Sequence, residues 1–483
     1  MESGRPNILL VVCDTLRPDF LSVYGGEIES ETFRTLATEG TLFGRAYAAG
    51  PGSSISHAAL FSGQYPSTSG VGGQVDVPPD VPLLASHLRD NGYSTFGMPG
   101  PSRTGSHWGY DRGFDEYLEK WTDIPSGISL TDLRDAFDDP ELVVPMPAEI
   151  LRRLRYGDDN YTSYLLDVFE RKIRGLSRPY FGFLNLTTVH TPYDPPRPYK
   201  EDATPALTRG KTGLAELFGT AERIDRDDVR LDRLAAAQKH EGVPRLYEDS
   251  SYLTNAEFDV LEAWYRASIR YLDDQLSATF ERLRAAGELE NTVVVLTADH
   301  GEHLGEHDLL KHMFFHFDPC LRVPLVIAGP GVPPDSRRED YVSLVDVFPT
   351  VCDLARVEPP DGLDGRPLFQ ADSEHRSAVY AENGPRELSD LFVDCLSPGA
   401  IERFSRGLKS VRTDEYLFTV DSAGEERLYK RPSEEEIPLS DGPVDELRAM
   451  IYERLGESFP PGSQSEELDE AIESNLRELG YIE

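Results

Sequence analysis

"PNILLVVCDT", residues 6–15, is an apolar run that ends at an acidic residue, Asp14. An unbroken apolar run of this kind is typical of a strand that is buried on both faces of a parallel sheet. The run is too short to span a membrane, and no small-residue cleavage site follows it. The stretch therefore predicts a central β-strand that places a carboxylate at its carboxyl end.

Two later stretches repeat this pattern. "PYFGFLNLTTVH" is an apolar run that leads to His190, and "NTVVVLTADHGE" leads to Asp299 and His300. In parallel sheets, ligands bind at the carboxyl ends of the strands. We therefore expect these side chains to meet Asp14 at one edge of a sheet.

Helical patterns separate the strand-like runs. Residues 81–98 read as an amphipathic helix, a glycine turn and a short strand, and residues 256–290 carry apolar side chains at helical spacing for about nine turns. "RVPLVIAGPG" (322–331) is a further strand. Strands that alternate with helices predict an α/β fold with a mostly parallel sheet sandwiched by helices.

The chain changes character after about residue 375. "LKSVRTDEYLFTV" and "ERLYK" predict short antiparallel strands, and the end of the chain is acidic and helical in tendency. We expect a catalytic α/β domain over residues 1–375 and a C-terminal α+β subdomain with an acidic helical tail over 376–483. Residues 121–160 and 198–255 are rich in Asp, Arg and Pro. They are either insertions that cap the site or solvent-exposed acidic segments of a halophilic surface.

The net charge of −37 is extreme, and the 48 basic residues include few lysines. Solvated carboxylates keep proteins soluble in a high-salt cytoplasm, so this balance favours a halophilic protein over a mesophilic acidic one. The chain has no basic patch to neutralise phosphates, which argues against a nucleic acid partner. The same charge argues against an anionic membrane surface.

The cysteines are few and scattered, with no Cys-x-x-Cys pair, so a thiolate zinc site is not expected. Without a secretion signal, this pattern predicts a cytoplasmic protein without disulfides and without membrane insertion. No feature of the sequence specifies an oligomeric state. The four cysteines are Cys13, Cys320, Cys352 and Cys395.

Asp14, Asp299 and His300 are the first candidates for metal ligands. Carboxylates at strand ends suit Ca²⁺ or Mg²⁺, and a set that includes an imidazole also accepts Mn²⁺. The structural alternatives are a helix cap for Asp14 and a hydrogen-bonded loop histidine for His300. Three neighbours in the same stretch are expected to support the ligands or to serve the structure: His303, Glu306 and His307.

Residues 50–67 read "GPGSSISHAALFSGQYPS" and gather three serines and a histidine. A serine beside a metal can attack a sulfate or phosphate ester, and a loop before a helix offers N–H groups to an anion. Ser53 is therefore a candidate nucleophile, with a helix N-cap as its structural alternative. Ser54 and Ser56 fit the N-cap role better, but spacing alone does not choose among the three.

The order of these motifs resembles a known family. "PNILLVVCDTLRPDFLSVYGG" looks like the opening of the sulfatase family, within the alkaline phosphatase superfamily, and "SSISHAALFSGQYPSTSGV" is similar to its nucleophile segment. "TTVHTPYDPP", "NTVVVLTADHGEHLGEHDLLKH" and "SLVDVFPTVCDLARVEPPDGLDGRPL" follow in the family's order. The resemblance covers residues 6–432 and implies an alkaline-phosphatase-like fold, in a member of haloarchaeal type.

The resemblance implies a metal and a nucleophile. Asp14, Asp299 and His300 would bind one divalent cation, with Ca²⁺ favoured over Mn²⁺ or Mg²⁺. Ser53 falls where the family has its nucleophile, a cysteine or serine that is usually converted to formylglycine. The family motif continues with a proline and an arginine, whereas this chain reads "SSISH". An unmodified Ser53 is therefore the simpler expectation, with His57 in place of the arginine, where it would orient Ser53 or contact the substrate.

The resemblance also implies substrate contacts. His190 would hydrogen-bond or protonate the leaving ester oxygen. Lys311 would hold a non-bridging oxygen, for which the point charge of a lysine is suited. Arg103 and His107 lie where the family has a Lys-Trp-His segment and are further candidates for substrate binding.

Two departures point toward relatives that act on phosphorus. Thr15 replaces a second aspartate that many members use on the metal, and His300 stands where many sulfatases have asparagine. The favoured function is hydrolysis of small-molecule or glycan sulfate esters. The alternatives are a phosphodiester or phosphonate monoester hydrolase, a transferase that moves a phospho- or sulfo-group onto a glycan, and a binding module without catalysis.

Overall fold

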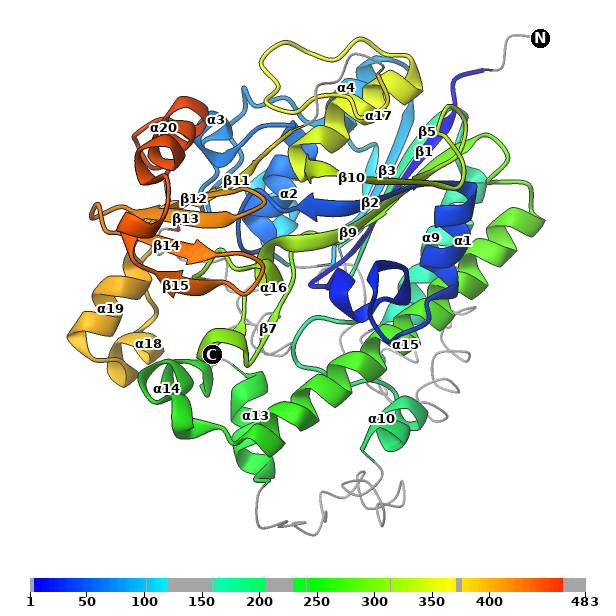
Figure 1. Ribbon diagram of the computed structural model, residues 1–483. Helices are drawn as coiled ribbons and strands as arrows, with labels where there is room; N and C mark the ends of the chain where they lie inside the picture. Colours follow the sequence, from blue (N-terminus) through cyan, green and yellow to red (C-terminus); the bar gives the residue numbers. More distant parts are fainter. Residues whose placement is uncertain are drawn as a thin grey trace.

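A computed structural model describes residues 4–100, 102–119, 159, 161–204, 229–239, 241–312, 314–370 and 376–463. An eight-stranded sheet runs through the centre of the molecule (Figure 1) in the order β10-β2-β9-β6-β1-β5-β3-β4. Its middle strand, β1 (Asn7–Cys13), is buried along its whole length and pairs in parallel with β5 (Tyr180–Leu186) and β6 (Thr292–Thr297). The other strands are β2 (Gly40–Tyr47), β3 (Ser94–Met98), β4 (Glu116–Tyr117), β9 (Arg322–Ala328) and β10 (Ser336–Ser343).

The sheet is mostly parallel, as expected. β9 runs antiparallel to both of its neighbours, β2 and β6, and the other pairings within this sheet are parallel. Nearly every side chain of β1, β5, β6 and β9 is buried, because helices cover both faces of the sheet. The prediction of a buried strand at residues 7–13 is confirmed.

Helices form a layer on each face of the sheet (Figure 1). α1 (Glu31–Glu39), α9 (Thr162–Gly175) and α15 (Asn255–Ala285) pack on one face, and α1 and α9 both contact α15. α2 (Ser53–Ser62), α4 (Leu84–Asp90) and α17 (Val347–Ala355) cover the other. The long helix α15 matches the expected nine-turn pattern.

A smaller antiparallel sheet follows in the order β11-β12-β13-β14-β15, as expected from the sequence after residue 375. One face of this sheet packs on α20 (Val444–Leu455) through a small apolar core that includes Phe418, Leu428 and Ile451. The strands are β11 (Val379–Asn383), β12 (Leu408–Arg412), β13 (Tyr416–Asp421), β14 (Glu426–Lys430) and β15 (Glu435–Ile437).

Shorter elements connect these layers. The hairpin strands β7 (His303–Leu304) and β8 (Leu310–Lys311) form a separate pair. The remaining α-helices among the described residues are α3 (Pro66–Ser69), α10 (Arg197–Ala203), α13 (Leu231–Gln238), α14 (Val243–Glu248), α16 (Asp318–Leu321), α18 (Asp390–Cys395) and α19 (Pro398–Ser405). Within the described ranges, no helix is both long and apolar enough to cross a membrane. The four cysteines are free thiols.

The expected capping segments are described in part. Residues 121–160 lie outside the described residues, apart from Asp159, and so does the acidic tail beyond residue 463. The described part of 198–255 lies against the strand ends: the Tyr247 hydroxyl donates to the Leu310 carbonyl at 2.6 Å, and Thr191 Oγ1 donates to the Gln238 carbonyl at 3.0 Å. A capping role for this segment, and the division of the chain at residue 375, stay predictions.

Asp318 joins the two sheets. It begins α16, just before β9, and its carboxylate lies 2.6 Å from Arg412 Nε and 2.8 Å from an Arg431 amino group, both from the C-terminal sheet region. Burial opposes ionisation of Asp318, but the two guanidinium groups outweigh it and lower the pKa of the carboxyl. The Asp318 carboxylate therefore pairs with two enclosed cations, and Glu434 lies 3.4 Å from Arg412 as a second acidic partner.

Replacement of Asp318 by asparagine should lower the free energy of unfolding by about 3 kcal/mol, because Arg431 then lacks an acidic partner among the described residues and Arg412 keeps only Glu434, at 3.4 Å. The measurement is urea unfolding followed by circular dichroism. Asp414→Asn is the matched control, since Asp414 is 71% exposed in its ion pair with Arg45. It should cost less than about 1 kcal/mol. Equal losses in the two variants would contradict this account.

Candidate active site

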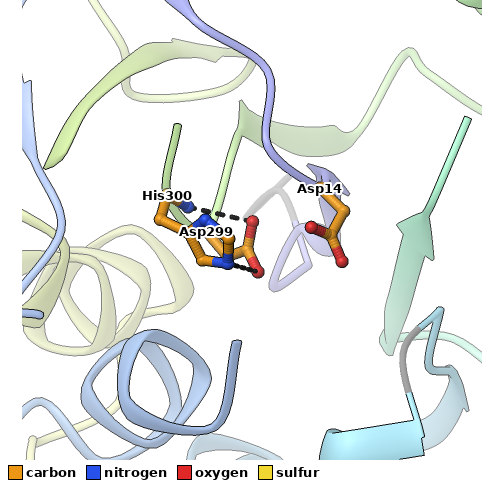
Figure 2. Close-up of side chains that lie close together, drawn as sticks. All are labelled: Asp14, Asp299 and His300. Carbon is orange, nitrogen blue, oxygen red and sulfur yellow. Dashed lines mark hydrogen bonds and ion pairs between the residues drawn. The ribbon is translucent and has the colours of Figure 1, made fainter. Parts of the chain in front are cut away.

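The structure brings together Asp14, Asp299 and His300 at the carboxyl ends of the two central strands (Figure 2). Asp14 follows β1 directly, and Asp299 and His300 follow β6. All three side chains are fully buried, and one ligand atom of each lies within 4.8 Å of the others. Since β1 and β6 pair in parallel, their ends must lie side by side, and the sheet thereby positions the cluster.

Several carboxylate oxygens of the cluster accept no hydrogen bond from the described residues. Neither Asp14 carboxylate oxygen has a hydrogen-bond partner among the described residues, and neither does Asp299 Oδ2. His300 Nδ1 lies 2.9 Å from the Gly301 carbonyl and must donate to it, so Nε2 is the nitrogen that carries the lone pair in the neutral ring. That lone pair faces Asp299 Oδ2 at 3.3 Å.

The carboxyl pKa values reflect this crowding. Burial, and then the negative charges of Asp299 and Glu302, raise the pKa of Asp14 well above its usual range. Burial opposes ionisation of Asp299 too, but His300 and His57 lower its pKa. Its Oδ1 atom accepts from the backbone N–H groups of Thr15 and His300, at 3.2 and 2.9 Å. Two carboxylates and an imidazole lone pair that face one another without donors fit a divalent cation.

Ser53 lies directly beside this cluster. It is the first residue of α2, after Gly52, whose φ of 92° is in the left-handed region. The Ser53 hydroxyl oxygen lies 3.4 Å from His300 Nε2, and the side chain is 8% exposed. A group bound at the cluster would therefore lie within reach of this hydroxyl.

The expected N-cap roles of the neighbouring serines are wrong. Gly52 occupies the N-cap position, and no side chain caps the helix there. The Ser54 hydroxyl donates to the Arg103 carbonyl at 3.4 Å, and the Ser56 hydroxyl donates to the Gly50 carbonyl at 2.8 Å. The Ser54 hydroxyl therefore binds the Arg103 segment and the Ser56 hydroxyl binds the loop before α2, while the Ser56 N–H donates to the Gly52 carbonyl at 3.1 Å.

His57 lies one turn beyond Ser53 and is fully buried. Its Nδ1 donates to the Ser53 carbonyl at 2.9 Å, and its Nε2 accepts from Asn185 Nδ2 at 3.1 Å. Asp299 Oδ2 lies 3.6 Å from Nδ1. Burial lowers the pKa of His57, so the ring is neutral and its tautomer is set by these two partners. His57 contacts the backbone of Ser53, not its hydroxyl.

Lys311 and His190 occupy neighbouring segments. Lys311 ends β8 with a positive φ of 67°, is 4% exposed, and forms no ion pair with any described residue. Burial lowers the pKa of its ammonium group to about 8, against the opposing charge of Glu302. His190 Nδ1 donates to the Thr191 carbonyl at 2.5 Å, and burial, then His312, lower the pKa of its ring to about 3.

Glu302 and His312 form a pair that our reasoning from the sequence missed. His312 Nδ1 donates to Glu302 Oε1 at 2.9 Å, and the His312 ring centroid lies 4.2 Å from that of His300 and 5.1 Å from that of His190. Burial raises the pKa of Glu302 to about 7. Two features of the sequence could have pointed to this pair. Glu302 belongs to the "ADHGE" stretch that contains Asp299 and His300, and His312 directly follows Lys311.

The remaining candidates have other surroundings. Arg103 lies in a short 3₁₀ helix beside Ser54, and its side chain is half-buried. His107 is exposed and packs its ring against Trp108. The three residues that we expected to have supporting roles lie outside the three-residue cluster: Glu306 pairs with Arg17, His307 stacks on Phe317, and His303 packs edge-on against Phe317.

Comparison with known proteins agrees with this geometry. A family model described as Sulfatase matches residues 6–357. Arylsulfatase K from Danio rerio is 26% identical over 378 residues, which cover 76% of this chain and 67% of that protein. The phosphonate monoester hydrolase of Agrobacterium radiobacter has a similar structure, with a TM-score of 0.67, 23% identity, and coverage of 93% of this chain and 95% of that one. A 2-O GAG sulfatase gives a TM-score of 0.65 at 19% identity, with 94% and 93% covered.

The orphaned carboxylate of Asp14 leads to a test that needs no substrate. In protein stripped with a chelator, Asp14→Asn should raise the melting temperature by several degrees, because it removes a buried carboxyl group whose ionised form is disfavoured by burial and by Asp299. The same variant should lose the stabilisation that added Ca²⁺ or Mn²⁺ gives the unmodified chain, and bound metal measured by elemental analysis should fall. The exposed Asp90→Asn is the control. Unchanged metal stoichiometry in Asp14→Asn would reject the assignment.

Proposed function

The chain belongs to the sulfatase family, and we propose that it is a metal-dependent hydrolase of sulfate esters in which Ser53 is the nucleophile. The observation that carries the proposal is the position of the Ser53 hydroxyl, 3.4 Å from His300 Nε2 at the edge of the Asp14–Asp299–His300 cluster. The hydroxyl also stands at the first turn of α2, where unpaired N–H groups favour an anion.

Bond formation at Ser53 is the proposed first step. A divalent cation held by Asp14, Asp299 and His300 would lower the pKa of the hydroxyl and neutralise charge on the substrate oxygens. Ser53 Oγ gives its proton to solvent and bonds to sulfur while the bond from sulfur to the ester oxygen breaks, and the leaving oxygen takes up a proton from His190. Water then attacks the sulfur of the serine sulfate, the bond from sulfur to Ser53 Oγ breaks, and Oγ takes up a proton from the water as inorganic sulfate is released.

Lys311 and His190 are assigned to the substrate oxygens. The Lys311 ammonium is protonated at neutral pH and lacks a carboxylate partner among the described residues, so it can hold a non-bridging oxygen. The His190 ring is neutral without substrate. An anionic ester beside it favours the protonated form, which can donate to the leaving oxygen.

Formylglycine is not part of the proposal. The residues after Ser53 are Ser54, Ile55, Ser56 and His57, without the proline and arginine of the modification motif. The hydroxyl of an unmodified serine already lies at the cluster. His57 and Asn185 hold the first turn of α2 in place without contact to the hydroxyl. The mass of the tryptic peptide that contains Ser53 tests this assignment directly.

Ca²⁺ is the proposed metal, since oxygen ligands predominate in the cluster, and Mn²⁺ or Mg²⁺ are the alternatives. Glycan or small-molecule sulfate esters are the proposed substrates, and the likeness to a 2-O GAG sulfatase supports a glycan. A phosphodiester or phosphonate monoester hydrolase is the second candidate. It is favoured by the histidine ligand His300 and by the structural likeness to a phosphonate monoester hydrolase.

Ser53→Ala should lower kcat/KM for an aryl sulfate by at least about a thousandfold, because the nucleophile is lost, while bound metal remains. Ser62→Ala, at the far end of the same helix, is the control and should act like the unmodified chain. Matched aryl sulfate and aryl phosphodiester substrates, assayed at high salt with Ca²⁺ or Mn²⁺, decide between the two functions. Full activity of Ser53→Ala would exclude this nucleophile.

The pKa of Lys311 predicts an alkaline limit to activity. The ammonium is protonated below about pH 8 and loses its proton above it, so kcat/KM should fall as the pH rises from 8 to 10. Lys311→Arg should shift this limb above pH 10, since a guanidinium stays charged. The measurement is kcat/KM from pH 6 to 10. If kcat/KM fell over the same pH range in the unmodified chain and in Lys311→Arg, a group other than Lys311 would be responsible.

A further inference from the structure

Two arginines near Ser53 lack the carboxylate partners that other enclosed arginines of this chain have. Arg17, Arg376 and Arg412 are paired with acidic side chains at close range. Arg103 and Arg386 are half-buried, and neither side chain forms an ion pair or hydrogen bond with the described residues. The chain has 85 acidic and 48 basic residues, and close carboxylate partners are common among the arginines that the structure describes.

Arg386 is held in place by apolar contact rather than by charge. Its guanidinium lies over the Phe314 ring, 4.8 Å from the centroid, and its Nε is enclosed without a hydrogen-bond partner. Its backbone N–H donates to the Ser405 carbonyl at 2.9 Å, which fixes the loop after β11. A guanidinium group that stacks on a ring in this way keeps its N–H donors available to a planar or tetrahedral anion.

Both arginines belong to segments that adjoin the nucleophile loop. The Ser54 hydroxyl donates to the Arg103 carbonyl. The Glu382 N–H, four residues before Arg386, donates to the Ala49 carbonyl at 2.9 Å, just ahead of Ser53. Phe314, beneath Arg386, lies three residues beyond Lys311. The two arginines therefore belong to segments, far apart in the chain, that both contact the region of Ser53.

The positive charge of Arg103 disfavours the charged form of Arg386. Burial lowers the pKa of both guanidinium groups to about 10, and the charge of Arg103 contributes to the lowering at Arg386. Like charges that are brought together and partly desolvated destabilise the free protein, and an anion between them removes that repulsion. Such an arrangement is expected of a binding site and has no evident structural benefit.

We infer that Arg103 and Arg386 form a second anion subsite, which binds a carboxylate or sulfate group on the substrate apart from the ester that is cleaved. The inference rests on the proposed function and narrows it. The substrate class becomes an ester with a further fixed anion, such as an acidic or multiply sulfated sugar. Lys311 and the Asp14–Asp299–His300 cluster serve the scissile group, and the arginine pair serves the second anion.

The first test compares isosteric substrates that differ only in the second charge. 3-Carboxyphenyl sulfate and 3-carbamoylphenyl sulfate, with their 4-substituted counterparts, are assayed at constant salt. The unmodified chain should prefer a carboxylate over its carboxamide by tenfold or more in kcat/KM. Arg386→Gln and Arg103→Gln should each bring this ratio close to one. A ratio near one in the unmodified chain, or an unchanged ratio in both variants, would overturn the subsite.

Arg403→Gln is the matched control. Arg403 also stacks on an aromatic ring, at 5.1 Å from the Phe315 centroid, but it is exposed and its neighbours include Glu425 and Glu436. Its replacement should leave the carboxylate preference intact. Loss of the preference in Arg403→Gln would show a general effect of surface charge instead of a subsite.

A binding measurement separates failure of the subsite from failure of the proposed reaction. 3-Sulfobenzoate and 3-carbamoylbenzenesulfonate cannot be cleaved at an ester, and their effects on the melting temperature need no turnover. The dianion should stabilise the unmodified chain more than the monoanion, and Arg386→Gln should remove the difference. If no sulfate ester is cleaved but this difference persists, the subsite stands and the reaction is wrong. Equal stabilisation by both probes would reject the subsite.

Discussion

The buried group of Asp14, Asp299 and His300 is the constraint on which the rest of the structure depends. Two carboxylates and an imidazole lone pair face one another without exposed surface, and three carboxylate oxygens lack hydrogen-bond partners among the described residues. Such charges cost several kcal/mol each unless a counter-charge is present. Parallel pairing of β1 with β6, at the centre of the sheet, holds the cluster together against this repulsion.

Ser53 is linked to that cluster through a neutral residue, His57. His57 links the Ser53 carbonyl to Asn185 at the end of β5, and its ring edge lies 3.6 Å from Asp299. A cation at this position would compete with a metal for Asp299. Because burial keeps the imidazole neutral, it can orient α2 and leave the carboxylate charge for another partner.

Positive charge is scarce in this chain, and its distribution is informative. Most enclosed arginines compensate carboxylates, as Arg412 and Arg431 do for Asp318 between the two sheets. Lys311, Arg103 and Arg386 are left without carboxylate partners among the described residues, and all three lie in segments that adjoin Ser53 or the cluster. The C-terminal sheet therefore contributes both to stability, through its link to α16, and to the proposed recognition of substrate, through the loop after β11.

Sequence patterns alone determined the α/β class, the buried strands that end at Asp14 and Asp299, and the long helix α15, because apolar runs and helical spacing are local properties. The order of motifs, by resemblance, also pointed to Ser53, His190 and Lys311. The roles of Ser54 and Ser56 were mistaken, since hydrogen bonds to the loop backbone replaced a helix cap. The Glu302–His312 pair and the position of Arg386 depend on which distant segments pack together. Tertiary structure decided those, because side chains far apart in the chain carry no local signal of their contact.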